Sequence, residues 1–478
     1  MIIKVKKCLF WIPGALTNLL IIYPAFADEI KYNQQLIDTL QTNSEILNLN
    51  EIELPATNAK LLTQQSTSNE SIAQVETEPS TPDETTNEAD IELEVIGEIY
   101  TLPQSTPTYV IEQEEIQKQG STSVADVLKR MPGFAINDVG HGADIHTGTY
   151  YRGHSINQSV FLINGRPINT NISTYHGATD LNSIPVESIE KIELSSGAVT
   201  TLYGSSGFGG IVNIITKAGG LTPKFNAAVE FGSLNFNNQQ TSYNGSFGSV
   251  KYNFSFERSF IDNRYKVPEG AANRNADGYL TNADTAISSY FGSLIFDLND
   301  RNTLSFDATK LSSRRGLVYF GFPLQRDRLD HDGLNLGLSW KTLLGNGENS
   351  ILTTTLGYNQ DYFSTYGPTF FQGREYYRTG VLDTQLFTAR LDHDWRTSPG
   401  NRLRWGLEFL NNNLDGKTDS TRPDRVALNE TENENLLNTA LFVLNTWNIT
   451  KNLELDLGLR QSFDSEFCNY LNPSVGFR

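Results

Sequence analysis

The amino-acid sequence predicts a mainly β protein in which a mixed α and β domain precedes an antiparallel transmembrane β-barrel. After residue 217, hydrophobic and polar residues alternate with a period of two. In one such run the alternate positions hold Leu334, Leu336, Leu338 and Trp340. The runs have about ten residues, the length of a membrane-crossing strand, whereas β-sandwich strands have about five or six. An apolar and a polar face of this length favour an outer-membrane barrel.

The connections between the runs support a barrel. Short turns such as TSPGN and ITKN alternate with long polar stretches near residues 262–283, 313–330, 366–382 and 413–435. Membrane barrels have short turns on one side and long loops on the other. About twelve strands fit into residues 221–478.

The amino terminus is typical of an export signal. Lys4, Lys6 and Lys7 precede an apolar region at residues 9–22, and Ala25 and Ala27 form a small-x-small cleavage site. We expect residues 1–27 to be a cleaved signal peptide. No uninterrupted apolar run reaches the roughly 18 to 20 residues of a spanning helix, so no helical membrane span is predicted.

The composition of residues 28–90 predicts a flexible acidic periplasmic linker. They are rich in Gln, Asn, Ser, Thr and Glu and cannot bury enough apolar surface to offset the entropy of ordering. The net charge of the chain is −18; residues 28–98 hold 16 acidic residues and 2 lysines, which gives −14 for this segment. Because the acidity is concentrated there, the chain is not expected to bind nucleic acid.

Residues 91–98 predict a short extended strand. Ile91, Leu93 and Val95 alternate with Glu92 and Glu94. A short mobile strand can add to the edge of a partner's sheet through backbone hydrogen bonds. The alternative is a first strand of the domain that follows.

Residues 108–217 predict a mixed α and β domain. Val124, Val127, Leu128 and Met131 lie on one face of a short helix. Ser123 can cap this helix, and the Pro-Gly pair after Met131 ends it.

Two apolar strands in this domain flank a glycine-rich bend, and the strand VFLINGRPI at residues 160–168 precedes them. Glycine fits where the backbone must turn or pack closely. The four structural glycines expected at the bend are Gly204, Gly207, Gly209 and Gly210.

The sequences SIEKIEL, LYG and GGIVNIITK within this domain resemble the plug domain of TonB-dependent outer-membrane receptors. The resemblance implies active uptake of a scarce ligand, such as a ferric siderophore, haem or cobalamin, across the outer membrane of a Gram-negative-type bacterium. It implies a barrel of 22 strands around the plug, of which this chain would supply about 12. A closed barrel of about twelve strands would be too narrow for a plug of about 110 residues, so we expect a truncated barrel. It also implies that a TonB-type inner-membrane energy-transducing complex binds a segment resembling the TonB box. The residues of that segment are Ile91, Glu92, Leu93, Glu94, Val95, Ile96 and Gly97.

The same resemblance places loops of the plug near an extracellular small-molecule or metal-chelate ligand. The candidate contacts are His141, His146, Tyr150, Tyr175 and His176. The histidine spacing matches no tight metal motif, which favours histidines that only form hydrogen bonds in loops over metal ligands, and no bound metal or cofactor is predicted. Arg152, in the sequence TYYRGHS, is expected to make a structural contact from plug to barrel.

The sequence also bears on functions other than uptake. The chain has no G-x-S-x-G elbow, H-E-x-x-H motif or phosphate loop, so an enzyme is not predicted. A truncated receptor that does not transport, or an exported β-rich binding protein, stays open as the alternative.

Overall fold

The computed structural model describes the part of the chain that carries the two sheets. The described residues are 108–136, 149–155, 158–168, 180, 182–195, 200–204, 207, 209–271, 273–317, 326–345, 349–424 and 430–477. The predicted signal peptide, linker and residues 91–97 lie outside them, as do His141, His146, Tyr175 and His176.

The N-terminal domain is built on a five-stranded sheet with the strand order β1-β7-β8-β5-β6. The parallel pair β5 and β8 is central, and the other pairs are antiparallel. Every residue of β5 and β8 is buried, which explains why both read as continuous apolar runs in the sequence. The strands are β1 (Thr108–Glu112), β5 (Ser159–Ile163), β6 (Arg166–Pro167), β7 (Ile189–Ser195) and β8 (Gly210–Thr216).

Short helices cover one face of this sheet. The helix predicted from the sequence is confirmed as α4 (Val124–Lys129), and the side chain of Ser123 accepts a hydrogen bond from the backbone N–H of Asp126. Val124, Val127 and Leu128 are buried in one apolar core with residues of β1, β5, β7 and β8. The other helical segments are α3 (Gln113–Gln119), α5 (Thr200–Tyr203) and η2 (Val186–Ser188), and a small second sheet holds β2 (Phe134–Ile136), β3 (Thr149–Tyr151) and β4 (His154–Ser155).

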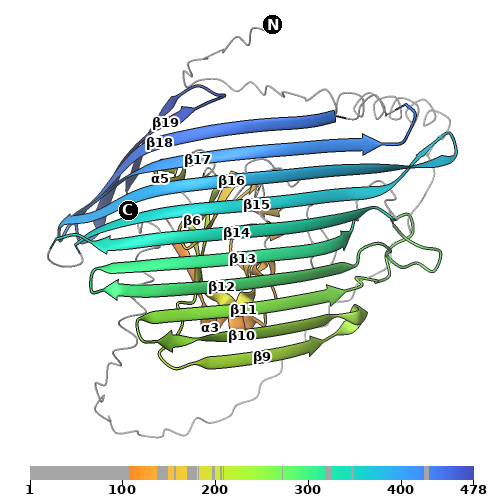
Figure 1. Cartoon of the computed structure of the whole chain (residues 1–478), viewed down its shortest axis with the longest axis horizontal. Helices are drawn as coiled ribbons and strands as arrows, with labels where there is room; N and C mark the ends of the chain where they lie inside the picture. Colours follow the sequence, from red (N-terminus) through yellow and green to blue (C-terminus); the bar gives the residue numbers. More distant parts are fainter. Residues whose placement is uncertain are drawn as a thin grey trace, which may run out of the picture. The chain divides into compact units, whose positions relative to one another are not determined.

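The rest of the described chain forms a twelve-stranded sheet in which each strand pairs with its neighbours in sequence. Every pair is antiparallel, as Figure 1 shows. The predicted fold class, mainly β with about twelve barrel-type strands, is confirmed. The strands are β9 (Lys224–Phe231), β10 (Asn237–Phe247), β11 (Val250–Ile261), β12 (Thr285–Asn299), β13 (Asn302–Gly316), β14 (Arg328–Leu343), β15 (Ser350–Phe371), β16 (Arg374–Ser398), β17 (Asn401–Ser420), β18 (Glu430–Thr450), β19 (Leu453–Asp464) and β20 (Tyr470–Phe477), with η4 (Ser233–Asn235) before β10.

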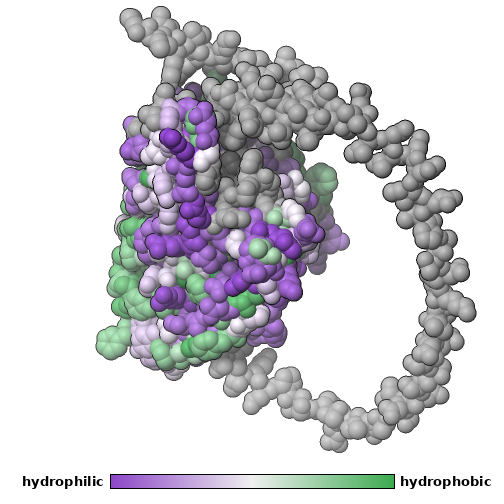
Figure 2. Space-filling model, turned by 90° about the vertical axis from the view of Figure 1, so that its right-hand side faces the viewer, coloured by the Kyte–Doolittle hydropathy of each residue, from purple (hydrophilic) through white to green (hydrophobic). Residues whose placement is uncertain are grey.

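The two faces of this sheet differ in polarity. Leu338 and Trp340 are exposed on the outer face, whereas Asn335 and Ser339, which alternate with them, are buried. Trp395 and Trp447 lie beside short turns of the sheet, where aromatic residues of membrane barrels meet the lipid interface. Figure 2 shows hydrophobic residues along the left margin and mainly hydrophilic residues over the strand ends that face the viewer. The apolar face is the one suited to lipid.

Two of the polar stretches predicted as loops are largely strand. β15 and β16 have 22 and 25 residues and pair up to a turn at Gln372 and Gly373, so the prediction of a loop at residues 366–382 is wrong. Both turn residues have positive φ, 48° and 74°, as a two-residue hairpin turn requires. A lipid bilayer needs only about 10 strand residues, so this hairpin continues well beyond it. Likewise, β17 and β18 occupy much of residues 413–435.

No helix within the described ranges is long and apolar enough to cross a membrane.

Gly210 opens β8 in a space that leaves no room for a side chain. Its φ is +126°, and an ideal Cβ would lie 2.7 Å from both the carbonyl oxygen of Ser195 and Cε1 of Tyr151. Both neighbours belong to strands of the same domain.

We predict that Gly210→Ala lowers the free energy of unfolding of the N-terminal domain by about 2–4 kcal/mol, because the methyl group requires both a strained φ and displacement of backbone. The measurement is the thermal unfolding midpoint of the detergent-solubilised chain. Gly220→Ala is the control, since its Cβ would meet nothing closer than 3.8 Å. Equal midpoints for the two variants would contradict the prediction.

Candidate functional site

The candidate site is the contact between the N-terminal domain and the inner face of the twelve-stranded sheet. In Figure 1 the domain lies behind the strands, and hydrogen bonds join it to β12, β13, β14, β15, β16 and β19. Most of these contacts are polar. They include three clusters, centred on Arg166, on Glu408 and on Asp180.

Arg166 projects from the β5–β6 hairpin into the sheet. The turn residues Asn164 and Gly165 have φ values of 49° and 76°, the geometry of a tight two-residue turn. The Arg166 side chain, only 2% exposed, donates from Nη1 and Nη2 to the two carboxylate oxygens of Asp307 on β13, at 3.1 and 2.6 Å. Nη2 also donates to Asn335 on β14 at 2.5 Å. This bidentate pair is the strongest kind of ionic hydrogen bonding that side chains make.

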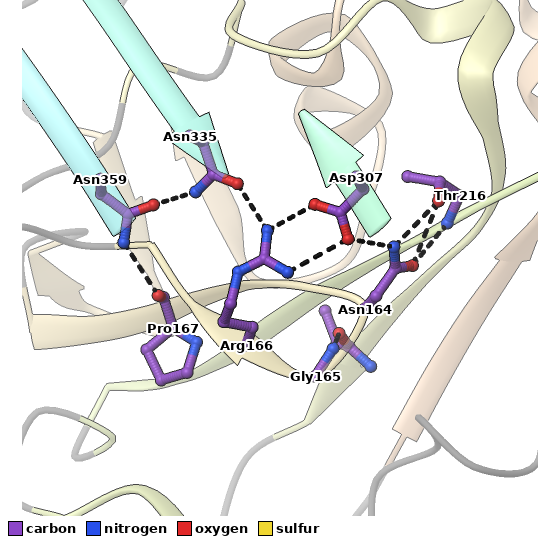
Figure 3. A network of polar contacts seen from close by, with 9 residues as sticks. Asn164, Gly165, Arg166, Pro167, Thr216, Asp307, Asn335 and Asn359 are labelled. Atoms are coloured by element: carbon purple, nitrogen blue, oxygen red, sulfur yellow. Dashed lines mark hydrogen bonds and ion pairs between the residues drawn. The ribbon is translucent and has the colours of Figure 1, made fainter. Parts of the chain in front are cut away.

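Neighbouring amides extend the Arg166 cluster, as Figure 3 shows. Asn335 donates to Asn359 on β15, and Asn359 donates to the carbonyl oxygen of Pro167 at 3.2 Å. On the other side, Asn164 donates to Asp307 at 3.5 Å and accepts from the backbone N–H of Thr216 at 3.0 Å. The hairpin is therefore fixed to three adjacent strands and to its own sheet.

Two glycines make room for the Arg166 side chain. A Cβ at Gly337 on β14 would overlap the guanidinium, and one at Gly357 on β15 would lie 2.6 Å from Cδ of Arg166. Gly337 and Gly357 are paired directly across the two strands. Together they form a slot in the inner face of the sheet.

A second cluster binds the short helix α5. Arg390 on β16 and Arg460 on β19 both pair with Glu408 on β17, and all three side chains are buried. Both arginines also donate to the carbonyl oxygen of Leu202, at 2.8 and 3.1 Å. Cations suit this position because the carbonyls at a helix C-terminus carry partial negative charge.

Aromatic rings pack around the same cluster. The guanidinium of Arg390 lies over the rings of Tyr203 and Phe442, at 4.6 and 4.5 Å from their centroids. Burial is the main cause that raises the pKa of the Tyr203 phenol, so this group stays neutral. Leu202 packs against Phe442 and Leu444 of β18, which is an apolar exception in a mainly polar interface.

The third cluster surrounds Asp180, which precedes η2 (Val186–Ser188) by six residues in the chain. Arg315 on β13 donates to the Asp180 carboxylate at 2.5 Å, and Nδ1 of His331 on β14 lies 3.3 Å from it. Burial alone would raise the pKa of Asp180, but the charge of Arg315 and the hydrogen bond from His331 hold it well below its ordinary value. Asp180 is therefore a buried carboxylate that stays ionised.

The site residues predicted from the sequence differ in their location and exposure. Tyr150 lies on β3 and is exposed. Gly204, Gly207, Gly209 and Gly210 are all buried. Among the described residues, no group of three or more His, Cys, Asp or Glu side chains is placed to hold a metal ion.

Arg166, not Arg152, makes the buried arginine contact from this domain to the sheet. Arg152 is exposed in the turn between β3 and β4, with φ 52°, and its backbone N–H donates to Gly133 at 2.7 Å. The turn directs its side chain to solvent, whereas the β5–β6 hairpin directs Arg166 to β13. An arginine directly after an Asn-Gly turn in an apolar strand was a signal that could have identified it.

We predict that Asp307→Asn lowers the free energy of unfolding by about 3–5 kcal/mol, because it leaves the buried guanidinium of Arg166 without its counter-charge. Denaturant unfolding of the purified chain measures the change. Asp330→Asn is the control, since its ion pair with Arg314 is exposed and is worth less than about 1 kcal/mol. A similar loss in both variants would show that the Arg166 pair is not special.

We predict that Gly337→Ala displaces the Arg166 guanidinium and costs about 2 kcal/mol, because the added methyl group occupies the slot. In the Gly337→Ala, Arg166→Ala double variant, the two losses should be clearly less than additive. Gly416→Ala serves as the strand control, since its Cβ would meet no atom closer than 3.5 Å. Full additivity would mean that the glycine and the arginine act independently.

Comparison with known proteins agrees with this geometry. Residues 101–211 match the family model described as TonB-dependent Receptor Plug Domain. A vitamin B12 transporter of Vibrio vulnificus is 29% identical over 205 residues, which are 43% of this chain and 32% of the transporter. The chain thus spans about a third of the length of this curated relative.

Solved structures share the fold at low sequence identity. The ferric yersiniabactin uptake receptor of Yersinia pestis is 16% identical, with a TM-score of 0.59 over 78% of this chain and 61% of the receptor. A ferric enterobactin receptor mutant of Pseudomonas aeruginosa is 18% identical, with a TM-score of 0.59 over 78% of this chain and 59% of the receptor. A siderophore receptor of Acinetobacter baumannii gives a TM-score of 0.56 at 17% identity, over 78% and 61%.

Proposed function

We propose that this chain, which belongs to the TonB-dependent receptors through its plug domain and the barrel strands that follow it, serves the active uptake of a scarce small molecule or metal chelate. Receptors of this family reside in the outer membrane of Gram-negative bacteria and are not enzymes. From here on, the N-terminal domain is called the plug and the twelve-stranded sheet the barrel strands. The observation that carries the proposal is the plug itself, fixed to the inner face of the barrel strands by the buried pair Arg166–Asp307.

The polar character of this contact suits a plug that must change position. Separating an apolar interface exposes hydrophobic surface to water, whereas separated ions and amides regain hydration. The core of the plug, by contrast, is apolar. A force on the plug can therefore release its barrel contacts at lower cost than it can open its core.

The outer membrane has no nucleotide hydrolysis of its own, so in this proposal the work comes from the inner membrane. We assign contact with a TonB-type complex to residues 91–97, which the sequence predicts to be a strand, after a predicted signal peptide at 1–27 and a predicted linker at 28–90. Strand addition would let the complex hold this segment through its backbone.

For the ligand, the proposal names a class and not a compound. The relatives include a vitamin B12 transporter and receptors for ferric enterobactin and ferric yersiniabactin. A ferric siderophore, haem or cobalamin is therefore the proposed ligand class. The proposed contacts in the plug loops are His141, His146, Tyr150, Tyr175 and His176.

We predict that Val95→Pro abolishes uptake but leaves ligand binding to whole cells intact, because proline removes a backbone donor from the strand that the complex would hold. The measurement is accumulation of radiolabelled iron chelates, haem and cobalamin in cells that express the protein. Val95→Thr, which preserves a strand-forming residue, is the control and should transport normally. Unchanged uptake with Val95→Pro would refute the role of this segment, and no uptake of any ligand by the unaltered protein would refute the transport proposal.

A further inference from the structure

His331 lies between a carboxylate of the plug and a carboxylate of the barrel strands. Its Nδ1 is 3.3 Å from Oδ2 of Asp180, and its Nε2 is 3.0 Å from Oδ1 of Asp361 on β15. The side chains of His331 and Asp180 are 1% and 3% exposed, and that of Asp361 is 27% exposed. The imidazole also stacks on Phe363, with 4.0 Å between ring centroids and 15° between the planes.

These contacts fix the number of protons on the ring. An ionised carboxylate only accepts hydrogen bonds, so each ring nitrogen that faces one must carry a hydrogen. A neutral imidazole has one N–H group and would turn a lone pair toward one of the two carboxylates. The doubly protonated imidazolium satisfies both contacts at once.

The surrounding charges support an imidazolium. Among the described residues, the charged groups that face His331 include Asp180 from the plug, Asp361 from β15 and, through Asp180, Arg315 from β13. Two carboxylates in direct contact with the ring favour its positively charged form. A cavity of about 30 Å³ beside the cluster is lined by neutral groups as well, both polar, such as Ser183 and Gln360, and apolar, such as Ile168 and Leu311.

The position of His331 places this cluster on the outer aqueous side. On the lipid-side face of β14, the apolar residues Leu334, Leu336 and Leu338 give way to Asp332 and Asp330. These two carboxylates pair with Lys310 and Arg314 on β13. Charged residues on that face mark the end of the lipid zone, and His331 lies beyond it, toward the long loops.

We propose that His331 is a proton-binding site that joins the plug to the barrel strands, and that loss of its proton to the external medium opens this contact. The site is distinct from the uptake role proposed above and does not depend on it. In terms of stability, a partner-stabilised imidazolium contributes fully in acid, and its contribution is lost as the pH rises through the titration of the folded protein. The plug is then held by the Arg166 and Glu408 clusters.

The direct test is nuclear magnetic resonance of the full chain labelled with ¹⁵N-histidine in detergent at pH 8. Imidazolium and neutral imidazole nitrogens have different chemical shifts, and His331→Gln identifies the signal. At this pH an exposed histidine is almost entirely neutral, since its ordinary pKa is about 6.5. We expect a larger doubly protonated fraction for His331 than for an exposed histidine at this pH; a fraction no larger than that would overturn the proposal. If His331→Gln does not fold, a chain in which the other five histidines are replaced by glutamine shows the same signal alone.

A matched pair of variants tests the contact itself. Asp361→Asn should raise the acid dissociation constant of the His331 imidazolium at least tenfold, because it removes one charged acceptor. Asp332→Asn, which neutralises a carboxylate on the opposite face of the same strand, should change this equilibrium less than twofold. Equal effects would mean that general electrostatics, and not the contact, holds the proton.

Hydrogen exchange tests the connection to the plug. Amides of residues 182–195 should exchange at least threefold faster in His331→Gln than in the unaltered chain at pH 6. This difference should vanish at the pH where His331 is deprotonated. An unchanged ratio across this range would overturn the role of the proton in holding the plug.

Discussion

Charged side chains are buried between the plug and the barrel strands, and the two that come from the plug, Arg166 and Asp180, have their charged partners on the barrel strands. Arg166 is matched by Asp307, Asp180 by Arg315, and the carbonyl end of α5 by Arg390 and Arg460. Burying one of these charges without its partner costs several kcal/mol, whereas the complete pair adds little net cohesion. Such an interface fixes the position of the plug on the barrel strands but contributes little to the free energy of separating the two. The plug has its own apolar core, whereas complementary charges and hydrogen bonds position it on the barrel strands.

Much of the fold follows from local sequence pattern. A period-two alternation of apolar and polar residues is enough to predict long strands with one lipid face, because strand side chains alternate strictly between faces. The helix at Val124 was predictable for a similar reason, since its cap and its buried face both lie within eight residues. The glycine-rich bend was recognisable too. The close approach of Ser195 and Tyr151 to Gly210 explains why that position has no side chain.

The contacts of the candidate site were not predictable in this way. Arg166 and Asp307 are 141 residues apart, and no local pattern connects them. A polar residue on the inner face of a barrel strand gives the same alternating sequence pattern whether its side chain faces water or a buried arginine. The same ambiguity explains the error at residues 366–382, because polar residues suit both a loop and a strand that has left the lipid. The resemblance pointed to Arg152 as the arginine that contacts the barrel strands. In the structure Arg152 is exposed, and Arg166 makes this contact.

The slot around Arg166 has a consequence for how this protein can vary. Gly337 leaves room for the plug side chain above it, and Gly357 leaves room both for that side chain and for the hydroxyl of Thr388. A larger residue at either glycine excludes the arginine, while loss of the arginine leaves Asp307 buried without its guanidinium partner and leaves a hole above two adjacent strands. Single substitutions are therefore penalised whichever position changes first. Arg166 on the plug and the barrel-strand positions more than a hundred residues after it should be inherited as a set, and among related sequences they should change together or not at all.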